Sequence, residues 1–317
     1  MVDVLMPVYN HEKYLNQAIE SVVTQITDFK FRLLIGEDCS KDSSREIVKQ
    51  YASLYPEIIV TFLHEKNLGS TANSSFLLNS INSKYFAMCE GDDYWIDDRK
   101  LQKQIDFLEK NPDYTLCFTD IDVVNEMNVS MPHPYKKPEN STISIQDIIL
   151  IRSSIVPTAS VVYRNILSFP LPKFYTEAIY GDLVFQLLMT DKGKGKYINE
   201  KTAVYRQHSA GISQINTTEF GSRESELVYD VFHNANEYFD FKYDKLFKKS
   251  MLELAKTILI YGSRNLKGYK KIKYILLHKK KYFKNMEKIY FKEIIYYSLL
   301  LFFPTILKSV TSKKSTI

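Results

Sequence analysis

The stretch Tyr85-Phe86-Ala87-Met88-Cys89-Glu90-Gly91-Asp92-Asp93 decides the fold, because an apolar run ends there in three carboxylates. A short apolar run of this kind predicts a buried strand. Open α/β sheets bind their ligands at the carboxyl ends of the strands. Clustered carboxylates at that edge suit Mg²⁺ or Mn²⁺, which take oxygen ligands. Taken alone, the motif is interpreted equally well as an acidic turn in solvent.

A second acidic strand end favours the metal-site interpretation. Gly36-Glu37-Asp38-Cys39-Ser40 follows another strand-like run, one strand–helix unit earlier in the chain. Helical patterns separate the strand-like runs of the first hundred residues, which lie at 4–8, 31–35, 58–63 and 85–89. Repeated βα units predict an α/β fold with a Rossmann-like, mostly parallel sheet flanked by helices. From residue 219 onward the pattern predicts a C-terminal helical extension.

Charge is distributed unevenly along the 317 residues. The net charge is +5, yet residues 264–317 hold 14 Lys and Arg against two acids, which leaves residues 1–263 at −7. An acidic body with a basic tail indicates two separate tasks. The three cysteines lack metal or disulfide spacing, which fits a reducing compartment. Met1 leads directly into a strand-like run without a signal-peptide pattern, so a cytoplasmic location is expected.

Four motifs together resemble the family 2 glycosyltransferases of the GT-A fold. They are Met6-Pro7-Val8-Tyr9-Asn10, Glu37-Asp38-Cys39-Ser40 with Asp42, Asn67-x-Gly69, and Glu90-Gly91-Asp92-Asp93 with Trp95. Order and spacing match over roughly residues 2–210, and the joint match is specific although each motif is weak alone. The resemblance implies inverting transfer of a sugar from a nucleotide-diphosphate donor. It divides the chain into a nucleotide-sugar-binding half (1–110), an acceptor-binding half (111–215) and a helical basic C-terminal region (216–317).

The acidic turn carries the metal chemistry that the resemblance implies. Asp93 resembles the family's metal-ligating carboxylate, and Asp92 resembles its partner at the donor ribose or the metal shell. Glu90 stands where the family often has Asp. A bound Mg²⁺ or Mn²⁺ neutralises the charge that builds on a nucleoside-diphosphate leaving group.

Four further residues are expected to bind the donor. Asp38 resembles the carboxylate that reads the nucleobase edge, where a uracil N–H can donate to it. A helix N-cap is the alternative for Asp38. Pro7 and Tyr9 resemble the turn that lines the nucleotide, and Asn67 belongs to the Asn-x-Gly turn. The family's Arg after that turn is missing, because Thr71-Ala72-Asn73 occupies its place.

The catalytic base is expected in the second half of the chain. Inverting transfer needs one carboxylate to deprotonate the attacking acceptor hydroxyl. Asp182, just before an apolar helical run, resembles the second acid of the family's Glu-Asp pair at a helix start, and an N-cap is the alternative. His208 lies in a segment resembling a loop that closes over the donor, where it would complete the metal shell or touch the diphosphate. A plain surface histidine is the alternative.

The tail suggests a membrane partner. Residues 264–308 mix basic, aromatic and apolar side chains, and the apolar run 294–303 is shorter than the roughly 20 residues of a spanning helix. This pattern predicts a helix on an anionic membrane surface, peripheral on the inner face of the cell membrane. A helical cap with a solvated lysine face is the alternative. The acceptor is then expected to be a lipid-linked glycan of the capsule, O-antigen or exopolysaccharide kind, and no nucleic acid is expected as a partner.

Two other functions fit part of the pattern. A nucleotidyltransferase that makes a nucleotide sugar would also need paired Asp residues, but it needs an early Gly-rich loop with Arg and Lys to hold a triphosphate. Residues 1–20 contain neither Gly nor Arg. A catalytically inactive, donor-binding scaffold is the second alternative, and the intact Asp93 and Asp182 speak against it.

Overall fold

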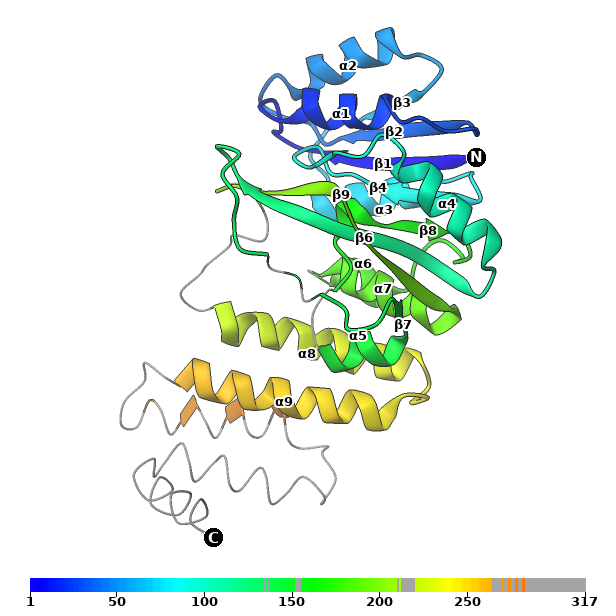
Figure 1. Cartoon of the computed structure of the whole chain (residues 1–317). Coiled ribbons are helices and arrows are strands. Elements are labelled where there is room, and N and C mark those ends of the chain that lie inside the picture. Colours follow the sequence, from blue (N-terminus) through cyan, green and yellow to red (C-terminus); the bar gives the residue numbers. More distant parts are fainter. Residues whose placement is uncertain are drawn as a thin grey trace. The chain divides into compact units, whose positions relative to one another are not determined.

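A computed structural model of the chain shows two compact units, residues Met1–Ile215 and Asn216–Ile317 (Figure 1). The structure describes residues 1–133, 135, 137–151, 155–178, 180–209, 211 and 220–263, together with residues 270, 273, 274, 277, 278, 281 and 282.

The first unit is built on one mixed sheet, which has nine strands among the described residues. Its order is β3-β2-β1-β4-β8-β6-β9-β5, and β7 pairs with β9. The strands are β1 (Val2–Val8), β2 (Phe31–Glu37), β3 (Ile59–Leu63), β4 (Tyr85–Met88), β5 (Tyr94–Trp95), β6 (Tyr114–Asn125), β7 (Thr142–Ile143), β8 (Val162–Arg164) and β9 (Lys194–Gln207). The run β3-β2-β1-β4 is parallel, as is the pair β6–β9, while β8 runs antiparallel to both β4 and β6. The predicted mostly parallel sheet flanked by helices is confirmed.

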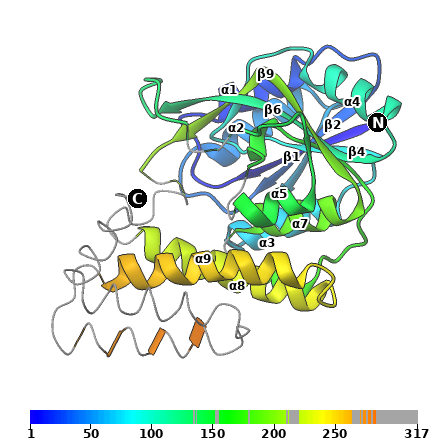
Figure 2. The same ribbon diagram turned by 60° about the horizontal axis from the view of Figure 1, so that its bottom comes forward.

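Helices cover both faces of this sheet (Figure 2). They are α1 (Leu15–Val23), α2 (Ser44–Leu54), α3 (Ser70–Asn79), α4 (Lys100–Lys110), α5 (Ile145–Ile151), α6 (Lys173–Glu177) and α7 (Gly181–Lys192). Helices α1, α2 and α4 pack on one face, and α3 and α7 pack on the other. Side chains alternate across a strand, so Val4 and Met6 of β1 face the α1 side. The buried strands therefore read as continuous apolar runs.

The apolar pattern of residues 158–163 is typical of a strand, but only its last two residues belong to one. Thr158–Ser160 form a 3₁₀ turn, and β8 begins at Val162. Buried side chains take the carbonyls of this turn: Trp95 Nε1 donates to Ala159 O (2.8 Å), and Gln104 Nε2 and Lys100 Nζ donate to Ser160 O (2.9 and 3.2 Å). Carbonyls held in this way are not available to a strand ladder.

The second unit is helical where the structure describes it. Helices α8 (Phe220–Tyr238) and α9 (Asp244–Ser263) pack together, and Tyr282 is buried in an apolar cluster with Leu252, Ala255, Ile258 and Leu259 of α9. The membrane segment predicted at 264–308 lies mostly outside the described residues. Among the described helices, none has the length and apolarity to cross a membrane.

Lys100 is an unusual core residue, because its ammonium group is fully buried at the start of α4. Its Nζ donates to Gln104 Oε1 at 2.7 Å and lies 4.5 Å from the centroid of the Trp95 ring. Burial lowers the pKa of Lys100 to about 7, whereas a lysine in an unfolded chain titrates near 10.4.

This difference predicts that the Lys100 side chain contributes stability that rises with pH. Between about pH 7 and pH 10 it binds more protons in the unfolded chain than in the folded protein, so its contribution to the free energy of unfolding should increase by up to about 1.4 kcal/mol per pH unit. Because the raised pKa values of Glu90, Cys89 and Cys117 act in the opposite direction, the increase is measured as the difference in the free energy of unfolding between the wild type and Lys100→Met. Urea denaturation should show this difference growing across the range, and Lys103→Met, whose side chain is exposed, should behave like the wild type. A difference that stays constant with pH would contradict the assignment.

Candidate functional site

Three strand ends are joined at the carboxyl edge of the sheet. The Asp38 amide donates to Val8 O (2.9 Å), which ties the end of β2 to the end of β1. The Gly91 amide donates to Pro7 O (3.2 Å), which ties the acidic turn after β4 to the same strand. Backbone hydrogen bonds therefore bring three of the four motifs to one edge.

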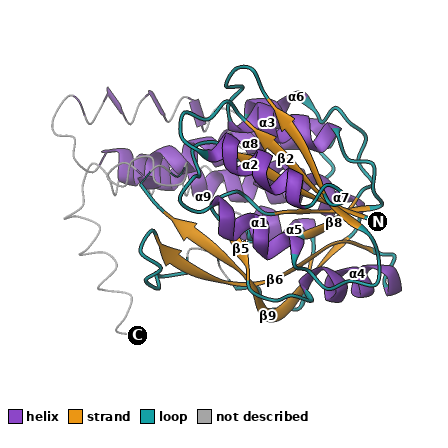
Figure 3. Ribbon diagram, turned by 90° about the horizontal axis from the view of Figure 1, so that it is seen from above, coloured by secondary structure: helices purple, strands orange, loops and turns teal. Residues whose placement is uncertain are grey.

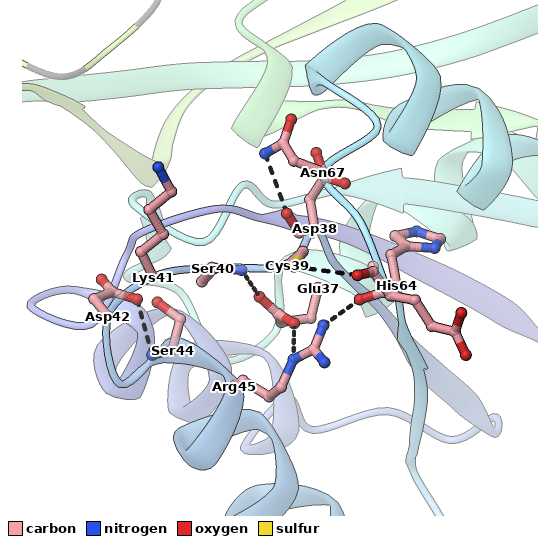
Figure 4. Close-up of polar contacts among 12 residues, drawn as sticks. Glu37, Asp38, Cys39, Ser40, Lys41, Asp42, Ser44, Arg45, His64 and Asn67 are labelled. Atoms are coloured by element: carbon pink, nitrogen blue, oxygen red, sulfur yellow. Dashed lines mark hydrogen bonds and ion pairs between the residues drawn. The ribbon is translucent and has the colours of Figure 1, made fainter.

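Asp38 and Asn67, both predicted to bind donor, lie together beside β2 (Figure 4). Asn67 Nδ2 donates to Asp38 O at 3.2 Å. The buried Asp38 carboxylate accepts the amides of Leu68 (2.7 Å) and Gly69 (2.9 Å), directly before α3. Asp38 is thus not the N-cap of the helix that follows it, since Ser43 holds that position. It fixes the Asn-x-Gly turn, and each carboxylate oxygen keeps a second lone pair for a further donor.

A second buried carboxylate, that of Glu37, holds the backbone that follows β2. Glu37 accepts the Ser40 amide at 2.6 Å and pairs with Arg45, whose guanidinium also donates to His64 O (Figure 4). Cys39 sits in the left-handed region at φ 56°, which L-residues adopt only at a cost. The Glu37 bonds hold the backbone there, and strained residues of this kind gather at binding sites.

The exposed end of β1 carries the other two predicted donor residues. Pro7 is half-buried, and the Tyr9 ring is exposed beside it. Asn10 follows at φ 56°, with its Oδ1 accepting the Lys41 amide at 2.8 Å. An exposed aromatic ring on a backbone fixed in this way is free to stack on a flat ligand.

The acidic turn concentrates three carboxylates in a nearly buried place. Burial, together with the charges of Asp92 and Asp182, raises the pKa of Glu90 to about 8. Burial and the same-sign charges of Asp92 and Glu90 raise the pKa of Asp93 well above its usual range. Asp92 differs: burial opposes its charge, but the hydrogen bond from His208 and the neighbouring His11 keep the pKa of Asp92 below its usual range. The turn therefore favours a bound positive charge.

The sequence-predicted His208 lies beside Asp92, and a second histidine joins it. His208 is buried, and its Nε2 lies 2.9 Å from Asp92 Oδ2. His11 Nε2 lies 3.8 Å from the same oxygen. No role was predicted for His11, and its only signal in the sequence is its place directly after the first motif. Gly91 makes room for it, since a Cβ there would lie 2.7 Å from His11 Nδ1.

Arg206 connects the acidic turn to its surroundings and was also missed by sequence reasoning. Its backbone amide donates to Asp93 Oδ1 at 2.9 Å, and its Nε donates to Asp92 O at 3.1 Å. The two terminal nitrogens donate to Asn128 Oδ1 (2.6 Å) and Gln17 Oε1 (3.0 Å). Among the described residues, the guanidinium donates to these neutral oxygens and pairs with neither carboxylate of the turn.

Asp182 enters the site from the other half of the unit. It lies in the first turn of α7, where Tyr180 is the N-cap, so Asp182 is not the cap itself. Its charge contributes to the raised pKa of Glu90 and, after burial, to that of Tyr135. Tyr135 stands in the segment after β6 and packs edge-to-face on Tyr205. The structure therefore brings Asp182 and the unpredicted Tyr135 to the acidic turn.

The residues of the turn fit a hard divalent cation. Asp93 Oδ2 is buried and has no hydrogen-bond partner among the described residues. Within the same described ranges, no group of three or more His, Cys, Asp or Glu side chains forms a complete metal cage. This donor set suits Mg²⁺ or Mn²⁺, which use one or two carboxylates together with waters and substrate phosphates.

Residues 3–167, just over half of the chain, match the family model described as glycosyl transferase family 2. The chain belongs to this family. An uncharacterized protein of Mycobacterium tuberculosis, Rv1520, is 32% identical over 213 residues, which cover 64% of this chain and 58% of that protein. A putative teichuronic acid biosynthesis glycosyltransferase of Bacillus subtilis, TuaG, is 33% identical over 108 residues, 34% of this chain and 42% of that protein. The chain thus spans less than two thirds of the length of these relatives.

Solved structures show the same fold. TarS of S. aureus in complex with UDP-GlcNAc superposes with a TM-score of 0.59 at 16% identity, covering 89% of this chain and 81% of that one. The mannosyltransferase PcManGT of Pyrobaculum calidifontis, in complex with GDP-Man and Mn²⁺, gives 0.55 at 12% identity, covering 96% and 87%. At such identities the likeness shows the GT-A fold alone.

The bracing role of Arg206 predicts a loss of stability on truncation. Arg206→Met removes the donors of three polar partners in a buried place, so urea denaturation should show a free energy of unfolding lower by roughly 2–4 kcal/mol. Arg99→Met, at an exposed arginine, is the matched control and should change little. A loss no larger than that of the control would show that the turn does not need Arg206.

Proposed function

We propose that this protein is an inverting glycosyltransferase that moves a sugar from a UDP-sugar to a glycan acceptor. One observation carries the proposal. Carboxylates from three separate elements, Asp38 after β2, Asp92 and Asp93 after β4, and Asp182 in α7, converge on one edge of the sheet. Because the chain belongs to the glycosyltransferase family, we interpret these carboxylates as parts of a sugar-transfer site. The relatives and solved structures named above are consistent with this interpretation.

On the donor side, we assign binding to the ends of β1 and β2. The exposed Tyr9 ring would stack on the base, beside Pro7. Asp38 would accept the base N–H while it keeps its two backbone bonds, and Asn67 would hold the turn that faces the donor. Asp92, held charged by His208, would position the ribose or a metal-bound water.

Asp93, with His208 nearby, would hold the divalent cation. Its orphaned Oδ2 is the oxygen that would point at the ion, and the Arg206 amide would keep Oδ1 fixed. When bound, Mg²⁺ or Mn²⁺ neutralises charge on the diphosphate leaving group. The chain itself supplies the fixed geometry, which lowers the cost of reorganisation during transfer.

Asp182 would act as the base that takes the proton of the acceptor hydroxyl. Burial and the charges of Asp92 and Asp182 raise the pKa of Glu90 to about 8. This favours the protonated form of Glu90 at neutral pH and disfavours Glu90 as the base. Tyr135, whose segment follows β6, would line the same space.

We further propose that the acceptor is a lipid-linked glycan of a surface polysaccharide and that the protein works at the inner face of the cell membrane. The relative TuaG, a putative teichuronic acid biosynthesis glycosyltransferase, supports the polysaccharide class. The basic composition of 264–308 supports an anionic membrane partner. Thermal melting with Mn²⁺ and a panel of UDP-sugars tests the function, because a true donor binds only the folded state and raises the melting temperature. An inactive scaffold would bind the donor without hydrolysing it.

Asp93→Asn should separate metal chemistry from folding. Asn has nearly the shape of the protonated Asp, and it still accepts the Arg206 amide, so the melting temperature should stay close to that of the wild type. Removing the charged ligand should reduce Mn²⁺-dependent donor hydrolysis by about 10²-fold or more. Asp98→Asn, at an exposed carboxylate a few residues away, should keep full activity. Undiminished wild-type turnover in excess chelator would rule out the metal assignment.

Asp182→Asn should affect turnover and not donor affinity. A positioned general base contributes about 10²–10⁴-fold to the rate, so transfer to acceptor should fall by that factor. The dissociation constant of the UDP-sugar, measured by calorimetry with Mn²⁺, should stay near the wild-type value. If donor affinity collapses together with turnover, Asp182 has a structural role and the base lies elsewhere.

A further inference from the structure

The hairpin tip, residues 125–131 at the end of β6, presents an apolar surface. Met127, Val129 and Met131 are 74%, 55% and 37% exposed. Met127 lies in the turn of the hairpin, and Val129 and Met131 lie on the segment that leaves it. Among the large hydrophobic side chains of the described chain, Met127 is the most exposed.

Five backbone amides of this tip donate within the hairpin. Asn125 Oδ1 accepts the amides of both Met127 and Val129 at 2.9 Å, and Asn125 O accepts the Asn128 amide at 3.0 Å. The Asn125 and Met131 amides are paired with carbonyls of the hairpin as well. Amides that are paired internally lower the cost of entering an apolar phase.

The tip also projects from the sheet that carries the acidic turn. In all three ribbon views the loop after β6 extends beyond the ends of the other strands (Figures 1, 2 and 3). Asn128 Oδ1 accepts from Arg206, whose amide holds Asp93. The projecting surface is therefore connected to the proposed metal site by one side chain.

We propose that the hairpin tip docks into the interface of a lipid bilayer. Three side chains are far too few for a stable protein partner, which buries about 800 Å² on each side. They suffice for shallow insertion, in which apolar side chains enter the headgroup boundary. The one charged residue of the tip is the exposed Glu126, so contact does not require anionic lipid. This surface is separate from the basic segment 264–308, and its lipid contact does not depend on the proposed reaction.

A tryptophan reporter tests the proposal on the full-length chain. The chain contains a single Trp, Trp95, which is buried and gives a constant background. Met127→Trp and, independently, Val129→Trp should lose most of the added emission on mixing with phosphatidylcholine vesicles whose acyl chains carry bromine as a quencher. Because the contact is apolar, the loss should persist at high salt.

The matched control is Leu54→Trp, at a residue 61% exposed at the end of α2. Its added emission should be unchanged by the same vesicles. Donor hydrolysis by each variant, measured in parallel, reports folding and tests the transferase function separately. Three results would overturn the proposal: no quenching at either hairpin reporter in hydrolysis-competent protein, equal quenching at position 54, or quenching that high salt abolishes. Self-association that Met127→Ser removes would likewise overturn it, in favour of a contact between two copies.

Discussion

Like charge concentrated in one buried turn is the constraint on which the rest of the site depends. Glu90, Asp92 and Asp93 share a few residues of chain, and a buried carboxylate is costly unless it is paired or protonated. The three side chains meet this cost differently. Asp92 stays charged beside His208, whereas the pKa values of Glu90 and Asp93 rise. A ligand that brings positive charge would relieve the repulsion, so the proposed cation would stabilise the turn.

In the described part of the chain, the surroundings of the acidic turn leave the Asp93 carboxyl group without a cationic partner that would compete with a bound cation. An arginine paired directly with Asp93 would remove the repulsion, but it would also compete with a cation. Arg206 instead donates to a main-chain carbonyl and to two side-chain amides, while its own backbone amide holds one oxygen of Asp93. The Tyr14 and Tyr94 rings lie near the guanidinium, at 4.7 and 5.3 Å, which favours a buried cation. These groups thus hold the turn in place, while Asp93 Oδ2 keeps no hydrogen-bond partner among the described residues.

The sequence predicted the parts of the fold that local pattern determines. The strands through β4 follow from short apolar runs between helical patterns, and the acidic strand ends meet because parallel strands end at one edge. Arg206 could not be predicted from pattern, because its partner Gln17 lies 189 residues away. The positions of His11 and Tyr135 near the carboxylates likewise depend on tertiary contacts, so the sequence pattern could not predict them. At residues 158–160 the apolar pattern misled, since Trp95, Lys100 and Gln104 bond the carbonyls that a strand would have used.

The same long-range contacts connect the two halves of the catalytic unit. Arg206 lies at the end of β9, Gln17 in α1, Asn128 in the hairpin tip and Asp92 in the acidic turn, so one buried side chain joins four elements. These four elements therefore keep fixed positions relative to one another, because close-packed and hydrogen-bonded groups deform little. A surface that engages the hairpin tip would therefore set where Asp93 stands relative to that surface. For an enzyme whose acceptor is held in a membrane, this fixed relation would decide which hydroxyl of the acceptor reaches Asp182.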